Sequence, residues 1–212
     1  MIQHVRGGAR MTVRAALVVL ALGAGTVLGQ EPIKVGAILS VTGPAAFLGD
    51  PEQKTLEMYV ERINAAGGVL GRKIEVVARD DNGTPGDAVR VAEELIAREK
   101  AVMLLGTFPS NVGLAVADYA KQRKVPFLAS EPLTDKMVWD NGNKYTYRLR
   151  ASTFMQTAML VPEAAKLGKK RWAIVYPNYE YGQSATAAFK KQMNVQQSGG
   201  LEFIEIAVPL GK

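Results

Sequence analysis

The sequence contains no cysteine and only one histidine, His4, among its 212 residues. The absence of cysteine excludes disulfides, thiol nucleophiles and zinc–thiolate sites. His4 lies in an N-terminal segment that we expect to be removed, so the mature protein is expected to contain no imidazole. This excludes a Ser-His-Asp triad, a histidine general base and histidine metal ligands. We therefore expect a protein that is not an enzyme and that needs no cofactor or metal.

Phosphate-binding motifs are also absent. The stretch TGPAAFLGD, residues 42–50, contains no Gly-Lys-Ser/Thr and so offers no lysine to a phosphate, and no Gly-x-Gly-x-x-Gly follows any expected strand. The acidic stretch DDNG, 80–83, lacks the spacing of an EF-hand loop, and we interpret it as a strand-to-helix turn. The stretch GQSA, 182–185, lacks the second glycine of a nucleophile elbow.

The N-terminal segment is typical of a secretory signal. Three arginines precede the apolar run AALVVLALGAGTVLG, and no acidic residue occurs before Glu31. The run is short for a membrane span and rich in small residues, which favours a signal peptide over residues 1–29, with Met11 as an alternative start. An uncleaved anchor is the alternative. Cleavage would lower the net charge from +6 to +3. A net charge this small, spread along the chain, does not indicate a nucleic-acid-binding surface.

From residue 31 onward, expected strands alternate with expected helices. The apolar run IKVGAILS predicts a buried strand, and Asp50 with Pro51 predicts the start of a helix. The stretch TPGD, 84–87, predicts the cap of a second helix. The buried faces of these two helices are expected to consist of Leu56, Tyr59, Val60 and Ile63, and of Ala88, Val91, Ala92 and Leu95. This alternation predicts an α/β fold with parallel, doubly wound sheets.

The alternation divides the chain into two expected lobes, with a boundary near residue 150. The first, 31–150, contains most of the strands. The second, 151–212, has two expected strands and two expected helices, one of them from about Gln183 to Gln192. A piece this small has little core of its own. The second lobe is therefore expected to be incomplete and the chain to be truncated at its C-terminus.

Ligands of open parallel sheets bind beyond the carboxyl ends of the strands, so the loops there hold the candidate residues. In the loop 42–50, Phe47 and Leu48 offer an apolar wall to a ligand. The alternative is that the loop is only a structural strand-to-helix turn. Ser110 stands at the expected start of a helix. Its hydroxyl and the free backbone N–H groups there could bind the carboxylate of a ligand. The alternative is that the serine only caps the helix.

Two further loops carry polar and aromatic candidates. In SEPLTD, Ser130, Glu131 and Thr134 follow an expected strand, and a carboxylate there could meet an ammonium group. The alternative is a solvated, charged turn. In PNYEYG, Tyr179 and Tyr181 have rings suited to closing over a ligand, or they pack on the surface.

Several of these stretches together resemble a known family. IKVGAILSVTGPAAFLGD, INAAGGVLGRKIEVVARDD, the helix AVRVAEELI and the loop GTFPSN are similar to the periplasmic leucine/isoleucine/valine-binding proteins, the type I solute receptors of bacterial ABC importers. The resemblance covers the chain from about Ile33 to its end. It implies two α/β lobes joined by hinge strands, with a small ligand held between them.

The resemblance also implies roles for individual residues. Ser110 matches the family serine that binds the ligand's α-carboxylate, and Tyr181 the tyrosine that closes over the ligand. Leu48 and Phe47 match the region that lines the side-chain pocket. The family usually has small residues and a threonine or serine at the positions of residues 130–134. Glu131 and Leu133 depart from that pattern and so from a simple branched-chain site, while Thr134 is one of the candidate binding residues.

The sequence thus predicts a periplasmic, monomeric solute-binding component of an ABC importer. Its partners would be an amino acid of the branched-chain type, or a related small carboxylate, and a membrane permease, with no nucleic acid. Two alternatives remain open. One is a secreted α/β hydrolase-like enzyme, and the other is a ligand-sensing receptor domain of the same fold.

Overall fold

The computed structural model describes residues 30–209. Its larger sheet has five strands in the order β2-β1-β3-β4-β5, and every neighbouring pair is parallel. These strands are β1 (Ile33–Leu39), β2 (Ile74–Asp80), β3 (Met103–Gly106), β4 (Phe127–Ala129) and β5 (Thr146–Arg148). The predicted parallel α/β architecture is confirmed.

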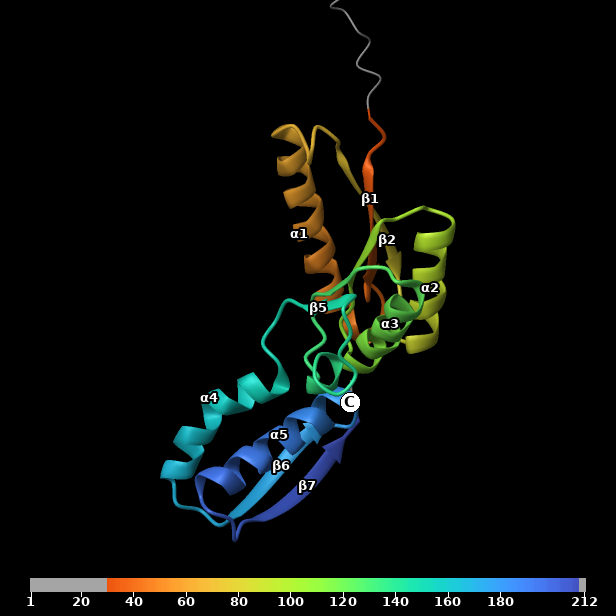
Figure 1. Cartoon of the computed structure of the whole chain (residues 1–212). Helices are drawn as coiled ribbons and strands as arrows, with labels where there is room; N and C mark the ends of the chain where they lie inside the picture. The colour runs from red at the N-terminus through yellow and green to blue at the C-terminus, as the bar shows by residue number, and fades with distance from the viewer. Residues whose placement is uncertain (1–29, 210–212) are drawn as a thin grey trace, which may run out of the picture. The chain divides into compact units, whose positions relative to one another are not determined.

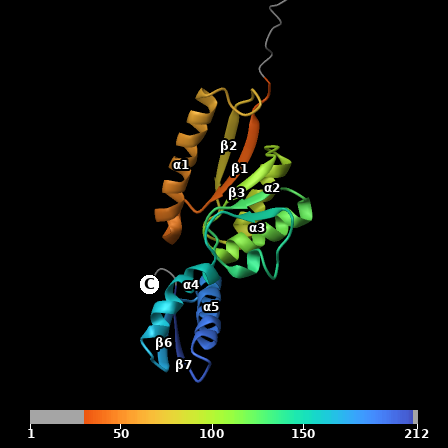
Figure 2. The ribbon, with the colours of Figure 1, turned by 60° about the vertical axis from the view of Figure 1, so that its left-hand side comes forward.

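Helices cover both faces of this sheet (Figures 1 and 2). Helix α1 (Ala46–Ala65) lies on one face, and α2 (Pro85–Ala97) and α3 (Ser110–Arg123) lie on the other. The main hydrophobic core fills the space between the sheet and α2 and α3. It includes Ile38, Ala88, Val91, Ala92, Leu95, Leu104, Val112, Val116, Ala120 and Phe127, each at most 2% exposed.

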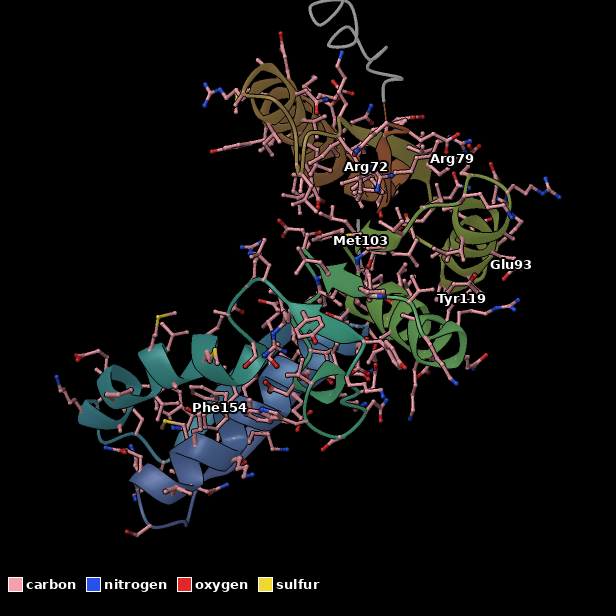
Figure 3. All side chains as sticks on the ribbon, turned by 45° about the horizontal axis from the view of Figure 1, so that its top comes forward. Arg72, Arg79, Glu93, Met103, Tyr119 and Phe154 are labelled. Carbon is pink, nitrogen blue, oxygen red and sulfur yellow. The ribbon has the colours of Figure 1, made fainter. Side chains whose placement is uncertain are left out.

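A polar contact also joins α2 to α3. The Tyr119 hydroxyl on α3 donates to Glu93 Oε2 on α2 at 2.9 Å, and Arg123 donates to the same oxygen at 2.7 Å. Figure 3 labels Glu93 and Tyr119 on their neighbouring helices. Burial and the neighbouring carboxylate raise the pKa of Tyr119 to about 12. The phenol is therefore neutral and serves as a donor at physiological pH.

Helix α1 begins earlier than predicted. The short 3-10 helix η1 (Gly43–Ala45) leads directly into α1 at Ala46, so Asp50 and Pro51 lie inside the helix. Pro44 suits the first position of this turn and starts the helical path before Asp50 is reached. Asp50 forms a 2.6 Å ion pair with Lys54 instead of a cap. The predicted buried face was also wrong at Tyr59, which is 53% exposed.

Helix α2 follows the prediction closely. The Thr84 hydroxyl accepts a hydrogen bond from the Asp87 backbone N–H at 3.3 Å and caps the helix. The four predicted core residues of this helix are all buried. This helix supplies much of the core against which β1 and β3 pack.

We expect Thr84→Ala to lower the free energy of unfolding by about 1 kcal/mol, because the orphaned N–H of the first turn would lose its partner. Urea denaturation would measure the change. Thr55→Ala is the control: that hydroxyl only donates back to the Pro51 carbonyl on an exposed helix face, so its loss should matter by less than about 0.5 kcal/mol. Equal effects of the two substitutions would contradict the capping role.

The second sheet contains β6 (Arg171–Pro177) and β7 (Glu202–Val208), which pair in parallel. Helices α4 (Thr153–Lys166) and α5 (Glu180–Gln196) accompany it, and α5 starts three residues before the predicted helix. The Phe189 ring of α5 packs edge-on against Trp172 of β6 and Phe203 of β7. The two sheets lie on either side of residue 150, although the lobe boundary there stays a prediction.

Apolar side chains of this second part are unusually exposed. On β6 and β7, Val175, Ile204 and Ile206 are 65%, 45% and 46% exposed. On α4, Met159 and Leu160 are 70% and 63% exposed. Within residues 30–209, no helix is long and apolar enough to cross a membrane. The predicted signal peptide, 1–29, lies outside the described residues.

Candidate functional site

Four adjacent strands of the larger sheet end in the same way: the residue directly after each of them is polar and buried. Ser40 follows β1, Asp81 follows β2, Thr107 follows β3 and Ser130 follows β4, with exposures of 1%, 0%, 0% and 7%. Parallel pairing brings these strand ends to one edge, where Ser130 N donates to Gly106 O at 2.9 Å and Asp81 N donates to Leu39 O at 3.0 Å. The carboxyl edge of the sheet therefore carries a row of buried polar groups.

One pair in this row is joined by a hydrogen bond. The Ser40 hydroxyl donates to Asp81 Oδ1 at 2.6 Å, and the Gly83 N–H donates to the same oxygen at 2.8 Å. Burial raises the pKa of Asp81, and these two donors partly offset the shift. The bonds close the turn between β2 and α2, which agrees with the interpretation of DDNG as a strand-to-helix turn.

Other buried oxygens of the same edge have no hydrogen-bond partner. They are Asp81 Oδ2, Thr107 Oγ1 and Ser130 Oγ, and Glu52 Oε1 on α1 joins them. Buried polar groups are paired in nearly all native structures, so an unpaired group needs an explanation. Several such oxygens at the carboxyl edge of a parallel sheet indicate a place prepared for polar groups that are not part of the protein fold.

Glu52 is the most perturbed acid of this edge. Burial raises its pKa from an ordinary value of 4.5 to about 7, and the nearby carboxylates of Glu131 and Asp81 act in the same direction. Ser130 and Arg150 partly offset the shift, although the Ser130 hydroxyl forms no hydrogen bond with the carboxyl group. Glu52 can therefore change its charge near neutral pH.

Ser110 is the first residue of α3, and Pro109 takes the N-cap position, so the interpretation as an N-cap was wrong. Ser110 is 2% exposed, and its Oγ accepts hydrogen bonds from the backbone N–H groups of Leu133 at 3.2 Å and Thr134 at 3.3 Å. The serine thus ties the start of α3 to the loop after β4. Its hydroxyl hydrogen remains available to an acceptor.

The loop after β4 holds the next two predicted site residues. Arg150 forms an ion pair with Glu131, whose side chain is 21% exposed. Thr134 is fully buried, and its hydroxyl donates to Glu180 Oε1 at 2.7 Å, while Lys136 pairs with Glu180 Oε2 at 3.0 Å. Both residues are thus engaged with neighbouring segments of the protein.

The predicted apolar residues lie at the start of α1. Phe47 is 70% exposed, and its ring meets Phe108 edge-on at a centroid distance of 6.4 Å. Leu48 is half-buried. Since Phe108 lies two residues before Ser110, this aromatic contact joins the loop after β1 to the loop after β3.

Tyr181 lies in the first turn of α5, where it contacts Gln156 and Tyr179. Its hydroxyl donates to Gln156 Oε1 at 3.4 Å, and its ring lies 6.1 Å from that of Tyr179. It lines a cavity of about 210 Å³ together with Ile174 and Phe189. Among the hydrogen bonds of residues 30–209, none joins Tyr181 to the other predicted site residues.

A larger cavity lies elsewhere, beside the 3-10 helix η2 (Asp135–Met137). It measures about 340 Å³ and is lined by the Trp139–Phe154 aromatic pair, by Lys136 and Lys191, and by residues of α5. Figure 3 labels Phe154 on α4. None of the predicted site residues lines this cavity. The described residues also contain no cluster of three or more acidic, cysteine or histidine side chains that could hold a metal.

Comparison with known proteins identifies the family. Residues 32–212 match the family described as periplasmic binding protein. The chain belongs to the periplasmic binding proteins. The Leu/Ile/Val-binding protein homolog 7 of Brucella suis biovar 1 (strain 1330) is 33% identical over 198 residues, which cover 89% of this chain and 48% of that relative.

Solved structures agree with this assignment. A solute binding protein of an ABC transporter from Rhodopseudomonas palustris BisB5, in complex with 3,4-dihydroxybenzoic acid, is 30% identical with a TM-score of 0.73 over 84% of this chain and 47% of that one. Another from R. palustris, in complex with 4-hydroxybenzoate, is 28% identical with a TM-score of 0.73 over 85% and 48%. This periplasmic binding protein chain spans about half the length of the curated relatives it matches.

The sequence interpretation missed part of this candidate site of the periplasmic binding protein. It named Ser130 as a polar loop residue and Asp81 as part of a turn, but it did not include Ser40, Thr107 or Glu52. A local signal exists for the first two, because each directly follows an apolar strand. Glu52 has no local signal, since only the packing of α1 on the sheet brings it to this edge.

Proposed function

We propose that this protein is the solute-binding component of an ABC importer and acts in the periplasm together with a membrane permease. Its ligand would be a small carboxylate, either an amino acid of the branched-chain type or an aromatic acid. Family membership supports the proposal, and so do relatives whose names and bound molecules belong to these two classes. The proposal includes a monomeric protein that binds its ligand without chemical change and has no nucleic-acid partner.

The observation that carries this proposal is the carboxyl edge of the five-stranded sheet, where Ser110 opens α3. The first N–H groups of a helix have no intrahelical partners, and the helix dipole favours negative charge there. Here the first backbone N–H group that bonds to a carbonyl four residues earlier is that of Gly113, which donates to Pro109 O at 2.9 Å. A ligand carboxylate at this end would be held by the N–H groups and by the Ser110 hydroxyl.

The other predicted residues receive roles under the same proposal. Phe47 and Leu48 would contact the apolar body of the ligand at the edge next to Phe108. Glu131 and Thr134 would bound it on the β4 side. Tyr181 would cover it after a hinge movement of the second lobe, 151–212, toward the first lobe, 31–150. The ligand contacts would bias the balance between open and closed forms, and no catalytic step is needed.

A thermal-shift panel tests the proposal, with leucine, isoleucine, benzoate and 4-hydroxybenzoate, and with their methyl esters as uncharged controls. A ligand that binds only the folded form raises the melting temperature by mass action. We expect a rise with at least one carboxylate and none with its ester. Shifts with the esters alone, or turnover of the esters, would contradict a carboxylate receptor.

We further expect Ser110→Ala to weaken binding of the active carboxylate by at least about tenfold, the value of a charge-assisted hydrogen bond. Titration calorimetry on the folded variant would measure it. Ser152→Ala is the matched control: Ser152 is equally buried and its Oγ accepts the Met155 N–H, so the variant loses the structural hydrogen bond that caps α4. Equal losses of affinity in both variants would refute a direct role for Ser110.

A further inference from the structure

A chain of hydrogen bonds connects Ser110 with the start of α5. Thr134 stands in the middle of this chain: its backbone N–H donates to Ser110 Oγ at 3.3 Å, and its hydroxyl donates to Glu180 Oε1 at 2.7 Å. Thr134 is fully buried, so little water competes for these bonds. Because Glu180 directly precedes Tyr181 in the sequence, the chain of bonds ends beside this tyrosine. Ser110 and Tyr181 are thus connected through Thr134 and Glu180.

Both carboxylate oxygens of Glu180 are engaged. While Oε1 accepts the Thr134 hydroxyl, Oε2 pairs with Lys136 Nζ at 3.0 Å, and the Glu180 side chain is only 13% exposed. Glu180 also lies in the first turn of α5, where the helix dipole favours a negative charge. These contacts fix the carboxylate and, with it, the first turn of α5.

A second set of bonds joins the same two segments. The Ser184 hydroxyl, one turn further along α5, accepts the Asp135 backbone N–H at 3.2 Å and lies 2.6 Å from the Thr153 hydroxyl of α4. Thr153 in turn donates to Asp135 Oδ2 at 2.7 Å. Since Asp135 follows Thr134, these bonds and the Glu180 contact attach two successive residues of the segment after β4 to the start of α5.

We propose that Glu180 is a positioning residue for ligand binding. Its bonds to Thr134 and Lys136 attach the helix that carries Tyr181 to the segment that is bonded to Ser110. The inference rests on the proposed function and deepens it: the hinge movement would turn about this contact, which guides Tyr181 to one place over the ligand. A tyrosine that is guided in this way loses less freedom on binding, so the affinity is higher.

Titration calorimetry on the full chain tests this role. The probe is the carboxylate that binds the wild type most tightly among leucine, isoleucine, benzoate and 4-hydroxybenzoate. We expect Glu180→Ala to weaken its binding by about fivefold, the cost of ordering one further side chain. Glu180→Gln keeps an oxygen for the Thr134 hydroxyl and loses only the pair with the half-exposed Lys136, so it should stay within about twofold of the wild type. An equal loss in both variants would overturn the role of the Thr134 contact.

A double substitution separates positioning from a general loss of stability. Thr134→Val removes the same contact from its other side, so the double variant with Glu180→Ala should lose no more affinity than the weaker-binding single variant. Gln192→Ala is the matched control on α5, because the Gln192 amide donates only to α4, to Phe154 O at 3.1 Å and Thr157 Oγ1 at 2.8 Å. It should lower the melting temperature and leave the affinity of the folded protein unchanged.

Additive losses in the double variant, or an equal loss of affinity in Gln192→Ala, would overturn the positioning role while the proposed function stands. If Glu180→Ala does not fold, Glu180→Asp takes its place. It keeps the charge, but its side chain is one methylene shorter and cannot reach the Thr134 hydroxyl from the same backbone position, so the same fivefold loss is expected. A wild type that binds none of the four carboxylates would overturn the proposed function and this inference together.

Discussion

Replacing Gly49 with alanine is expected to lower the free energy of unfolding by about 3 kcal/mol. Gly49 is the one buried residue of α1, and a Cβ added to it would lie 2.1 Å from the Ser40 carbonyl oxygen. No flexible side chain can yield there, so α1 must shift away from the end of β1. The shift would also displace Glu52 from the carboxyl edge. Urea denaturation at neutral pH would measure the loss.

Gly86→Ala is the control for this substitution. Gly86 also lies in a helix, α2, but a Cβ there would meet no atom within 4 Å. Alanine at that position should stabilise the protein by about 0.5 kcal/mol, because it restricts the unfolded chain without a clash. A Gly49→Ala variant as stable as the wild type would show that α1 does not rest on Ser40 through this glycine.

The second large effect is a pH dependence of stability that disappears in Glu52→Gln. The pKa of Glu52 is about 7 in the folded protein and 4.5 ordinarily, so the folded state holds the proton more tightly than the unfolded state. The contribution of this group to stability is complete below pH 4.5 and is lost as the pH rises to about 7. We expect a loss of about 2 kcal/mol, less than the full shift would give, because Glu52 is only half-buried.

Asp81 acts in the same direction, since burial raises its pKa as well. Urea denaturation from pH 4 to pH 8.5 would measure the loss in the wild type and in Glu52→Gln. The variant should match the wild type at pH 4 and exceed it by about 2 kcal/mol at pH 8, because the neutral amide needs no ionisation. Glu61→Gln makes the same chemical change at an exposed position of α1 and should follow the wild-type curve. Parallel curves for wild type and Glu52→Gln would mean that Glu52 ionises as it does in water.

Much of the secondary structure could be predicted from the sequence because its signals are local. The cap of α2 at Thr84 and its buried stripe follow from the residue types and their spacing within about ten residues. Helix α1 shows the limit of such reasoning. Asp50 and Pro51 form a good start signal, but the turn at Gly43 and Pro44 begins the helix earlier. A stronger local signal upstream thus overrides a weaker one downstream.

Tyr59 and Met159 show a different limit. An apolar stripe predicts a buried face only if another element covers it. In residues 30–209 the core fills the α2–α3 side of the sheet, while Tyr59 on α1 and Met159 on α4 remain more than half exposed. Periodicity within a helix cannot say how much surface its neighbours provide.

The sequence by itself determined the order of strands and helices, the lack of cysteine and of all but one histidine, and the family resemblance of its loops. These features depend only on residue type and spacing along the chain. Only the tertiary structure decided which polar groups share the carboxyl edge. Ser40, Asp81, Thr107 and Ser130 are far apart in the sequence, and parallel pairing of the strands places them in one row. Glu52 joins them because Gly49 lets α1 approach the end of β1, and burial there, not its sequence neighbours, raises its pKa.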